Sequence, residues 1–331
     1  MIHEQHIESE SDDLFITGAL KHIVPGNQGR VLDGRRTPGY IESFDKESCM
    51  FIWRITAFED KGKHWEIPAE EISSYQFYKN SAVLPETEVE EMISTCQKFQ
   101  TRLTIPVSEE AYSATQELIN QQERCATAWL KEHSAFLKNH KTIDLCDNTG
   151  DPDLYADLAQ YMISEGLLEL EQKTAEQYLL NPYSGEWIKG MKIVMAEAGM
   201  IAYDGSIPRT KDIFSGIGVK ELRKKYIVAR SAFLRAIFHL CGHREVPLYR
   251  GMSSASPLFE TPCTLVSTTF SADVAKAFAS VDDSSACKSC YWVKFSYPIE
   301  HLFMTFYETK QFNERYKEQE AIIYYRKKLT L

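Results

Sequence analysis

The pattern of hydrophobic and polar positions changes along the chain, and the first part is β-like. Residues 13–84 contain short apolar or aromatic runs, such as CMFIWRITAF and HWEIPAEEISSYQFY, separated by Gly, Pro, Asp and Lys. Short runs bounded by turn residues are typical of β-strands. This segment therefore predicts a small β-rich domain, loosely similar to SH3-like barrels, and residues 1–12 before it predict a flexible tail.

From residue 85 to residue 169 the apolar residues recur at helical spacing, as in SEEAYSATQELINQQERCATAWLKEHSAFL. Ser108 before Glu109 and Glu110 predicts a helix start, because serine caps a first turn and acidic residues favour the positive end of the helix dipole. We interpret this region as a helical connector or lid that packs on its neighbours.

A further helical block begins at residue 170, and after residue 248 the chain turns β-rich. The runs PLYRG, CTLVSTTFS, CYWVKFSYPI and QEAIIYY predict strands, and SADVAKAFAS predicts a helix. Ser271 is the expected cap of that helix, with Asp273 in its first turn. The chain as a whole is therefore expected to be an α+β protein.

Composition limits the classes of function. The 331 residues carry 44% hydrophobic and 25% charged side chains and a net charge of −10, which argues against a chain that coats nucleic acid by bulk electrostatics. No apolar stretch approaches the ~20 residues needed to span a bilayer. The acidic, polar start MIHEQHIESESDDLF predicts no secretory signal and hence a cytoplasmic protein that avoids membranes, although export without a leader stays open.

The eight cysteines are scattered, as expected of reduced cytosolic thiols. Cys287 and Cys290 form one CxxC, and Cys241 and His243 could complete a set of four zinc ligands. A single CxxC in a polar loop is a weak signal, so we expect no metal.

Two glutamates stand at the start of the last apolar run, in KEQEAIIYY. In an extended chain, successive side chains alternate between faces, so Glu318 and Glu320 are expected to share one face. Two carboxylates this close raise the free energy of the doubly charged state. The simplest interpretation of an isolated pair is a solvated strand end; the functional one is a catalytic pair.

Two earlier segments carry further candidate chemistry. In VPLYRGMSS, Arg250 presents a planar fork suited to phosphate, and Gly251 allows a ligand or a strand to approach the backbone. In LVSTTFS, the hydroxyls of Ser267, Thr268 and Thr269 can bond backbone and ligand together. The alternatives are a surface ion pair for the arginine and a polar strand edge for the hydroxyls. Phe270 is expected either to pack against a flat ligand ring or to join the core.

The order of these segments resembles a known family. An arginine strand, a Ser-Thr-Thr strand leading into a helix and a Glu-x-Glu strand follow one another in LYRG, STTFSADVAKAFAS and KEQEAIIYY. This order resembles the R-S-E class of NAD-dependent mono-ADP-ribosyltransferases, a family of toxins and related enzymes. The segment EQYLLNPYSGEWIKG also resembles a helical stretch with a Tyr-Ser/Thr-Gly step in that family. The resemblance covers residues 170–331 and implies a catalytic domain of split β-sandwich fold with flanking helices.

The resemblance implies roles for the matching residues. Arg250 would contact the pyrophosphate of NAD, the co-substrate, and Ser267, Thr268 and Thr269 would hold the nicotinamide ribose pocket. Glu320 would stabilise the oxocarbenium-like carbon as nicotinamide leaves, and Glu318 would orient and deprotonate the incoming nucleophile. Glutamate at the first position goes with arginine acceptors in the family.

Acceptor recognition is expected in TFYETKQFNERY, which resembles the acceptor-recognition turn of the family. Tyr307, Phe312 and Tyr316 are the candidates for touching the target, and buried aromatic anchors are the equal alternative for each.

The leading prediction is a toxin or effector that ADP-ribosylates an arginine of a target protein. The closest alternative is the same chemistry on a nucleic acid, in a toxin–antitoxin or phage-defence component. It rests on a basic stretch with few acids, made of Lys211, Lys220, Arg223, Lys224, Lys225, Arg230, Arg235 and Arg244. NAD hydrolysis without an acceptor and a non-catalytic binding protein on the same fold stay open, as does a neutralising antitoxin or regulatory partner that acts through the N-terminal regions.

Overall fold

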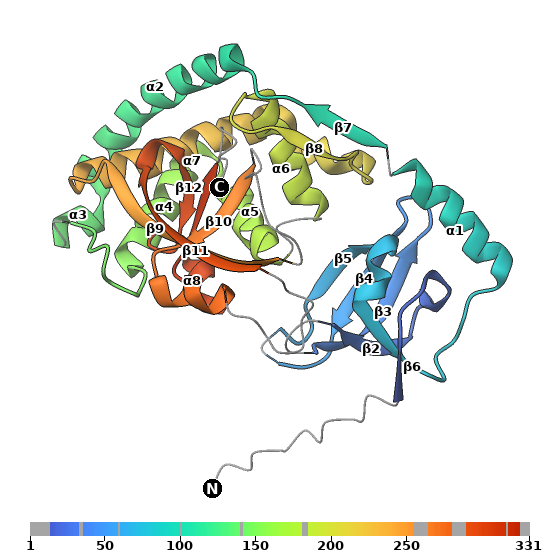
Figure 1. The fold of residues 1–331 in the computed structure, drawn as a ribbon. Coiled ribbons are helices and arrows are strands. Elements are labelled where there is room, and N and C mark those ends of the chain that lie inside the picture. Colours follow the sequence, from blue (N-terminus) through green and yellow to red (C-terminus); the bar gives the residue numbers. More distant parts are fainter. Residues whose placement is uncertain are drawn as a thin grey trace, which may run out of the picture. The chain divides into compact units, whose positions relative to one another are not determined.

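In the computed structural model, the chain folds into two units, each built from helices and antiparallel sheet (Figure 1). The structure describes residues 14–32, 36–58, 60–99, 101–139, 142–180, 185–254, 264–279, 289–315 and 317–324. The first unit contains the described residues up to Arg102 and the segment Ser206–Thr210, and the second contains most of the rest. This division differs from the expected boundaries after residues 84 and 169, because the first long helix belongs to the first unit and the following helices belong to the second.

The first unit is built around a six-stranded antiparallel sheet with the strand order β1-β6-β2-β3-β4-β5. Its elements are β1 (Phe15–Thr17), η2 (Leu20–His22), β2 (Gln28–Val31), β3 (Pro38–Asp45), β4 (Met50–Ile55), β5 (His64–Pro68), η3 (Ala69–Ser74), β6 (Tyr75–Tyr78) and α1 (Glu86–Lys98). Phe51, Trp53 and Ile55 of β4 are buried at alternate positions, as the period of a half-buried strand requires.

The predicted β-rich character of this unit is confirmed, but the barrel-like closure is not. Within the described residues, β1 and β5 are the two edges of the sheet and do not pair with each other. Helix α1 instead covers part of the apolar face through Met92 and Cys96, which lie one helical turn apart and are both buried. A helix packed on one face buries that surface without closing the sheet.

A disulfide joins Cys49, directly before β4, to Cys96 of α1, with 5.9 Å between their Cα atoms. The expectation that all cysteines are reduced thiols is therefore wrong for this pair. Among the described residues, Cys125, Cys146 and Cys241 are free thiols. The scattered spacing hid the pair because 47 residues separate the two cysteines, and only the packing of α1 on the sheet brings them together.

Helices make up most of the first half of the second unit (Figure 1). They are α2 (Glu109–His133), α3 (Ala135–Asn139), α4 (Pro152–Glu165), α5 (Leu168–Leu180), α6 (Glu186–Glu197), η4 (Lys211–Phe214), η5 (Gly216–Gly218) and α7 (Lys220–Leu240), with a two-stranded ribbon of β7 (Arg102–Ile105) and β8 (Tyr203–Ser206). Helices α2 and α7 lie side by side, and α7 packs against the C-terminal sheet. Thirteen residues of α7 are buried, which makes it the central helix of this core.

The C-terminal sheet of the second unit is antiparallel and five-stranded, in the order β11-β9-β10-β13-β12. Its elements are β9 (Glu245–Ser254), β10 (Leu265–Thr269), α8 (Ala272–Phe278), β11 (Ser289–Pro298), η6 (Ile299–His301), β12 (Leu302–Thr305), α9 (Lys310–Arg315) and β13 (Glu320–Tyr324). Buried residues of this sheet and of the helices form one continuous hydrophobic core. The predicted α+β class is therefore confirmed.

Both predicted helix caps are present. The hydroxyl of Ser108 accepts a hydrogen bond from the amide of Ala111 at the start of α2, where Glu109 and Glu110 occupy the first turn. The hydroxyl of Ser271 likewise accepts from the amide of Val274 at the start of α8. These caps satisfy amides that have no partner within the helix.

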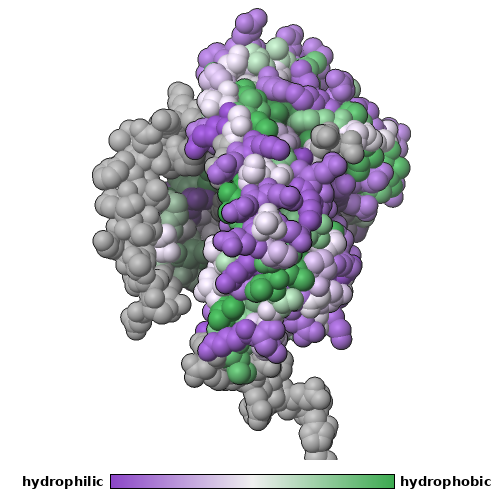
Figure 2. Space-filling view, turned by 90° about the vertical axis from the view of Figure 1, so that its right-hand side faces the viewer, coloured by the Kyte–Doolittle hydropathy of each residue, from purple (hydrophilic) through white to green (hydrophobic). Residues whose placement is uncertain are grey.

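The face of the molecule drawn in Figure 2 carries hydrophobic residues in small groups between hydrophilic ones. Among the described residues, no helix is both long enough and apolar enough to cross a membrane.

We expect removal of the disulfide to destabilise the first unit. Replacing both cysteines, as Cys49→Ala/Cys96→Ala, should lower its free energy of unfolding by about 2–4 kcal/mol, because the bond closes a long loop in the unfolded chain. Urea unfolding of the oxidised chain followed by circular dichroism measures this change. The matched control is Cys125→Ala, which removes an exposed, free cysteine and should leave stability unchanged. A wild type that unfolds at the midpoint of the double variant would contradict the prediction.

Candidate active site

Three neighbouring strands bring the three predicted motifs to one place. Strand β10 lies between β9 and β13, and Thr269 is paired with both Tyr249 of β9 and Glu320 of β13. Arg250, which follows Tyr249, therefore lies beside the Ser-Thr-Thr strand, which in turn lies beside the glutamate strand. An open cavity of about 120 Å³ occurs here, lined by Tyr249, Arg250, Gly251, Ser267, Thr268, Thr269, Val274, Phe278, Glu318 and Glu320.

Ser267 holds the carboxylate of Glu320. Its Oγ donates a hydrogen bond to Oε1 of Glu320 at 2.6 Å. On the other side of Ser267, the guanidinium of Arg250 donates from Nη1 to the backbone carbonyl of Ser267. The side chains of Arg250 and Glu320 are thus both anchored to the same residue, on the strand between them.

The two threonines hold the backbone of the glutamate strand. Thr268 Oγ1 donates to the carbonyl of Ala321 at 2.7 Å, and Thr269 Oγ1 donates to the carbonyl of Glu318 at 2.6 Å. Thr269 also accepts a hydrogen bond from the amide of Ser271, the cap of α8. The three hydroxyls therefore have different roles. Ser267 binds the carboxylate of Glu320, and the two threonines bind the backbone of the segment that carries this carboxylate.

The segment before Glu320 has an unusual backbone. Lys317 and Gln319 have positive φ angles of 51° and 49°, a left-handed conformation that costs free energy for residues other than glycine. The strand therefore begins at Glu320, and the expectation that Glu318 belongs to an extended strand is wrong. Glu318 nevertheless lines the same cavity as Glu320, because the left-handed residues redirect the chain. The amide of Phe270 binds the carbonyl of Gln319 at 3.0 Å and holds this conformation.

Burial changes the acidity of both glutamates. Burial raises the pKa of Glu320 from 4.5 to about 7, against the hydrogen bond from Ser267, which lowers it, and with a further increase from the charge of Glu318. Burial also raises the pKa of Glu318. A carboxyl with a pKa near neutrality in a cavity is a feature of functional sites, because an ionised group is kept there at a cost to stability.

Gly251 allows α8 to lie directly on β9. A Cβ atom at this position would come within 1.6 Å of the backbone carbonyl of Ala275 in α8, so any side chain there would displace the helix. The predicted close approach to the backbone of Gly251 is present, but the group that approaches is helix α8. Helix α8 in turn places Phe278, an exposed aromatic side chain, at the rim of the cavity.

The structure places three of the predicted contact residues in the core. Phe270 is buried against Phe306 and Tyr307, so it is a core residue and not a ligand platform. Tyr307 and Phe312 are 3% and 2% exposed, which corrects the expectation that they touch a target. Both are buried anchors of the turn and helix that follow β12. Tyr316 lies outside the described residues, as do Tyr183 and Ser184 of the predicted Tyr-Ser-Gly step.

The zinc ligands considered for the CxxC do not form a described site. Cys287 lies outside the described residues, and His243 uses Nε2 to contact the carbonyl of Ile143 at 2.9 Å. In the part of the chain that the structure describes, no group of three or more His, Cys, Asp or Glu side chains could hold a metal.

Tyr249, Val274 and Phe278 also line the cavity, although no motif in the sequence marks them as site residues. Tyr249 could have been predicted as a site residue, because it is the neighbour of Arg250 in the sequence. Val274 and Phe278 lie four residues apart on α8, a spacing that puts both on one helix face. That face could not be assigned to the cavity without the contact between α8 and Gly251.

The raised pKa of Glu320 predicts a pH-dependent effect of Glu320→Gln on stability. The folded state holds the proton more tightly than the unfolded state, so this group's contribution to stability is present below pH 4.5 and is lost as the pH rises through about 7. The neutral amide avoids this loss. We expect the variant to gain up to about 3 kcal/mol over the wild type between pH 4.5 and pH 8, since one pKa unit is ~1.4 kcal/mol.

Urea unfolding of both proteins at several pH values measures this difference. The exposed residue Glu117 provides the control variant Glu117→Gln, for which the difference should not change with pH. A stability difference between Glu320→Gln and wild type that is constant from pH 4.5 to pH 8 would show that Glu320 titrates normally.

The contacts of Arg250, Ser267, Glu318 and Glu320 are the basis on which function is inferred. The chain matches no family model, no curated protein and no solved structure.

Proposed function

We propose that this protein is an NAD-dependent mono-ADP-ribosyltransferase, a toxin or effector that transfers ADP-ribose from NAD to an arginine of a target protein and releases nicotinamide. The observation that carries the proposal is the bond from Ser267 to Glu320 beside the guanidinium of Arg250. Residues 250, 267 and 320 are far apart in sequence, and the pairing of β9, β10 and β13 brings them to one cavity in the order that the resemblance to the R-S-E class requires.

Under this proposal, the C-terminal sheet with its helices belongs to the split β-sandwich of that class. The cavity would take NAD with its pyrophosphate toward Arg250, because a guanidinium forms paired hydrogen bonds with phosphate oxygens. The bonds of Arg250 to Ser267 and to the sulfur of Met252 fix the direction of its side chain. A fixed cation loses little conformational entropy when it binds an anion.

Glu320 supplies the negative charge that the reaction needs. When the glycosidic bond of NAD breaks, its electron pair leaves with the nicotinamide nitrogen and positive charge develops on the ribose carbon. A carboxylate held next to that carbon stabilises the transition state, as in glycoside hydrolysis. The hydrogen bond from Ser267 orients the carboxylate and lowers the pKa that burial raises. The cationic nicotinamide ring of bound NAD would favour the ionised form further.

Glu318 completes the transfer. The guanidinium of a target arginine is a weak nucleophile until it loses a proton. Glu318 lines the same cavity and would accept that proton while the arginine nitrogen forms the new bond to the ribose carbon. Its raised pKa brings it closer to the operating pH, which suits a general base.

The structure weakens the case for a nucleic-acid acceptor. Arg223, Arg230 and Arg235 were the centre of the basic stretch, and all three are at most 1% exposed. Lys220 and Lys225 contact Glu197 and Glu165. The basic stretch is therefore largely internal or neutralised, so a protein arginine remains the better acceptor for this site.

We expect Glu320→Gln to lower the rate of nicotinamide release by about 1000-fold or more, because the amide carries no charge to stabilise the transition state. Release from NAD in the presence of a cell lysate, with label transfer followed in parallel, measures both activities. Glu117→Gln is the matched control and should behave as wild type. If Glu320→Gln turned over NAD at the wild-type rate, the proposed function would be wrong.

Glu318→Gln should separate transfer from hydrolysis. We expect label transfer to protein to fall by at least ~100-fold, because the acceptor can no longer be deprotonated, while nicotinamide release in buffer stays within about tenfold of wild type. Treating the labelled lysate with protease or with nuclease identifies the acceptor class. Nuclease-sensitive label would exclude an arginine acceptor, and equal loss of both activities would exclude the separate role of Glu318.

A further inference from the structure

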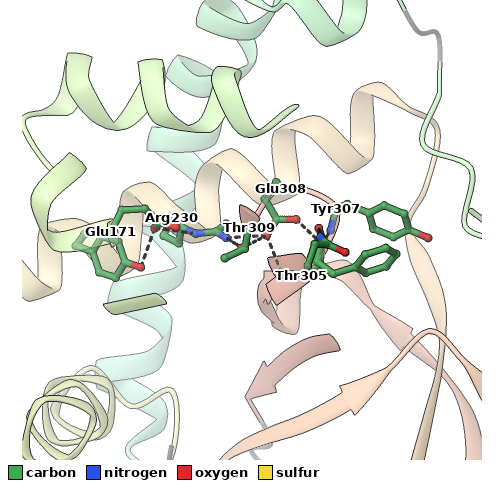
Figure 3. A network of polar contacts seen from close by, with 9 residues as sticks. Glu171, Arg230, Thr305, Tyr307, Glu308 and Thr309 are labelled. Carbon is green, nitrogen blue, oxygen red and sulfur yellow. Dashed lines mark hydrogen bonds and ion pairs between the residues drawn. The ribbon is translucent and has the colours of Figure 1, made fainter. Parts of the chain in front are cut away.

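Three buried charged residues from three segments of the second unit meet in one network. Nε of Arg230, on α7, lies 3.0 Å from Oε2 of Glu171 on α5, and its Nη2 lies 2.6 Å from Oε1 of Glu308 in the turn after β12. Figure 3 shows the guanidinium between the two carboxylates. Arg230 is 0% exposed and Glu308 1% exposed, so water does not screen these contacts.

Glu308 organises the turn that follows β12. Its carboxylate accepts hydrogen bonds from both the amide and the hydroxyl of Thr305, three residues earlier (Figure 3). The guanidinium of Arg230 also donates to Oγ1 of Thr309 at 2.9 Å, and the amide of Thr309 donates to the carbonyl of Thr305. The turn Thr305–Thr309 is thus folded around one carboxylate and tied by one arginine to α7.

The same turn holds the backbone of Glu320. The amide of Phe306 donates to the carbonyl of Glu320 at 2.8 Å, and Thr305 is paired with Ala321 in the sheet. On the other side, the amide of Phe270 donates to the carbonyl of Gln319. The start of β13 is therefore held between β10 and the turn Thr305–Thr309, at the point where a left-handed residue must be stabilised by its surroundings.

The charges in this network are costly to bury. Burial alone would lower the pKa of Arg230, but the charges of Glu171 and Glu308 raise it overall, so the guanidinium stays charged. Burial raises the pKa of Glu171 despite the opposing effect of Arg230. Apolar residues can often replace such a group without loss of stability, so its presence suggests a role in specifying geometry. Hydrogen bonds in fixed directions specify one position of the turn more sharply than apolar packing does.

We propose that Arg230 and Glu308 are positioning residues for Glu320: through the turn Thr305–Thr309 they set the place of its backbone and hence of its carboxylate. The proposal rests on the proposed function of Glu320. Neither side chain lines the cavity, so both act through the turn and not on the substrate.

Steady-state nicotinamide release by the full chain tests this, with kcat and KM for NAD determined separately from pH 5 to pH 9. We expect Glu308→Leu to lower kcat by about 100-fold and Arg230→Met by about 10-fold or more, since displacement of a reacting group by an ångström has effects of this size. KM should stay within about threefold of wild type, and the acidic limb of the pH profile should shift as Glu320 moves.

Two variants separate positioning from general stability. Arg223→Met removes an equally buried arginine of the same helix, which binds the carbonyls of Gly218, Trp187 and Ile213 and has no contact with the turn. It should lower thermal stability and leave kcat within about threefold of wild type at a temperature where all variants are folded. Glu308→Gln keeps an acceptor for the amide of Thr305 and should retain more activity than Glu308→Leu.

The proposal is overturned if Arg230→Met and Glu308→Leu keep a kcat within threefold of Arg223→Met. Should Glu308→Leu not fold, the double variant Arg230→Met/Glu308→Gln takes its place with the same expected and opposing results. If the wild type releases no nicotinamide, the proposed function is wrong. Hydrogen exchange at the amide of Phe306, which binds the carbonyl of Glu320, then tests whether Arg230 and Glu308 position that backbone. Faster exchange in Arg230→Met than in Arg223→Met supports it, and equal exchange excludes it.

Discussion

The antiparallel register between β10 and β13 is the constraint on which the candidate site depends. Pairing of Thr269 with Glu320 brings the hydroxyl of Ser267 to the carboxylate of Glu320 and leaves the two threonines to bind the backbone of the same strand. A slip of one residue would turn every side chain of β13 to the opposite face and remove the carboxylate from the cavity.

The site is kept at a cost to stability. A glutamate with its pKa raised to about 7 and two left-handed residues before it are both unfavourable, and neither would be selected for folding alone. The surrounding structure offsets this with directed hydrogen bonds from Phe270, Phe306 and the threonines. Strained backbone conformations and carboxyl groups with raised pKa values both cost folding free energy, and both are concentrated at functional sites of proteins.

The buried arginines of α7 show how tertiary structure changes the meaning of a charged sequence. By pattern, Arg223, Arg230 and Arg235 belong to a basic helix face. In the fold, α7 packs against α2, α5 and the sheet. Each guanidinium binds acceptors from other segments. These are backbone carbonyls for Arg223, two carboxylates for Arg230, and amide, carbonyl and phenol oxygens for Arg235. Arginine suits this role because its planar fork of donors can bind several acceptors at once.

The sequence by itself determined the features that depend on neighbours in the chain. The β-rich first segment, the helical middle, the caps at Ser108 and Ser271 and the order of the arginine, hydroxyl and glutamate strands all follow from local period and side-chain chemistry. Tertiary structure decided what depends on distant partners: the open sheet covered by α1, the Cys49–Cys96 bond and the burial of Phe270, Tyr307 and Phe312. An aromatic or charged side chain has the same local pattern inside or outside, and only the surfaces that pack against it settle its burial and its pKa.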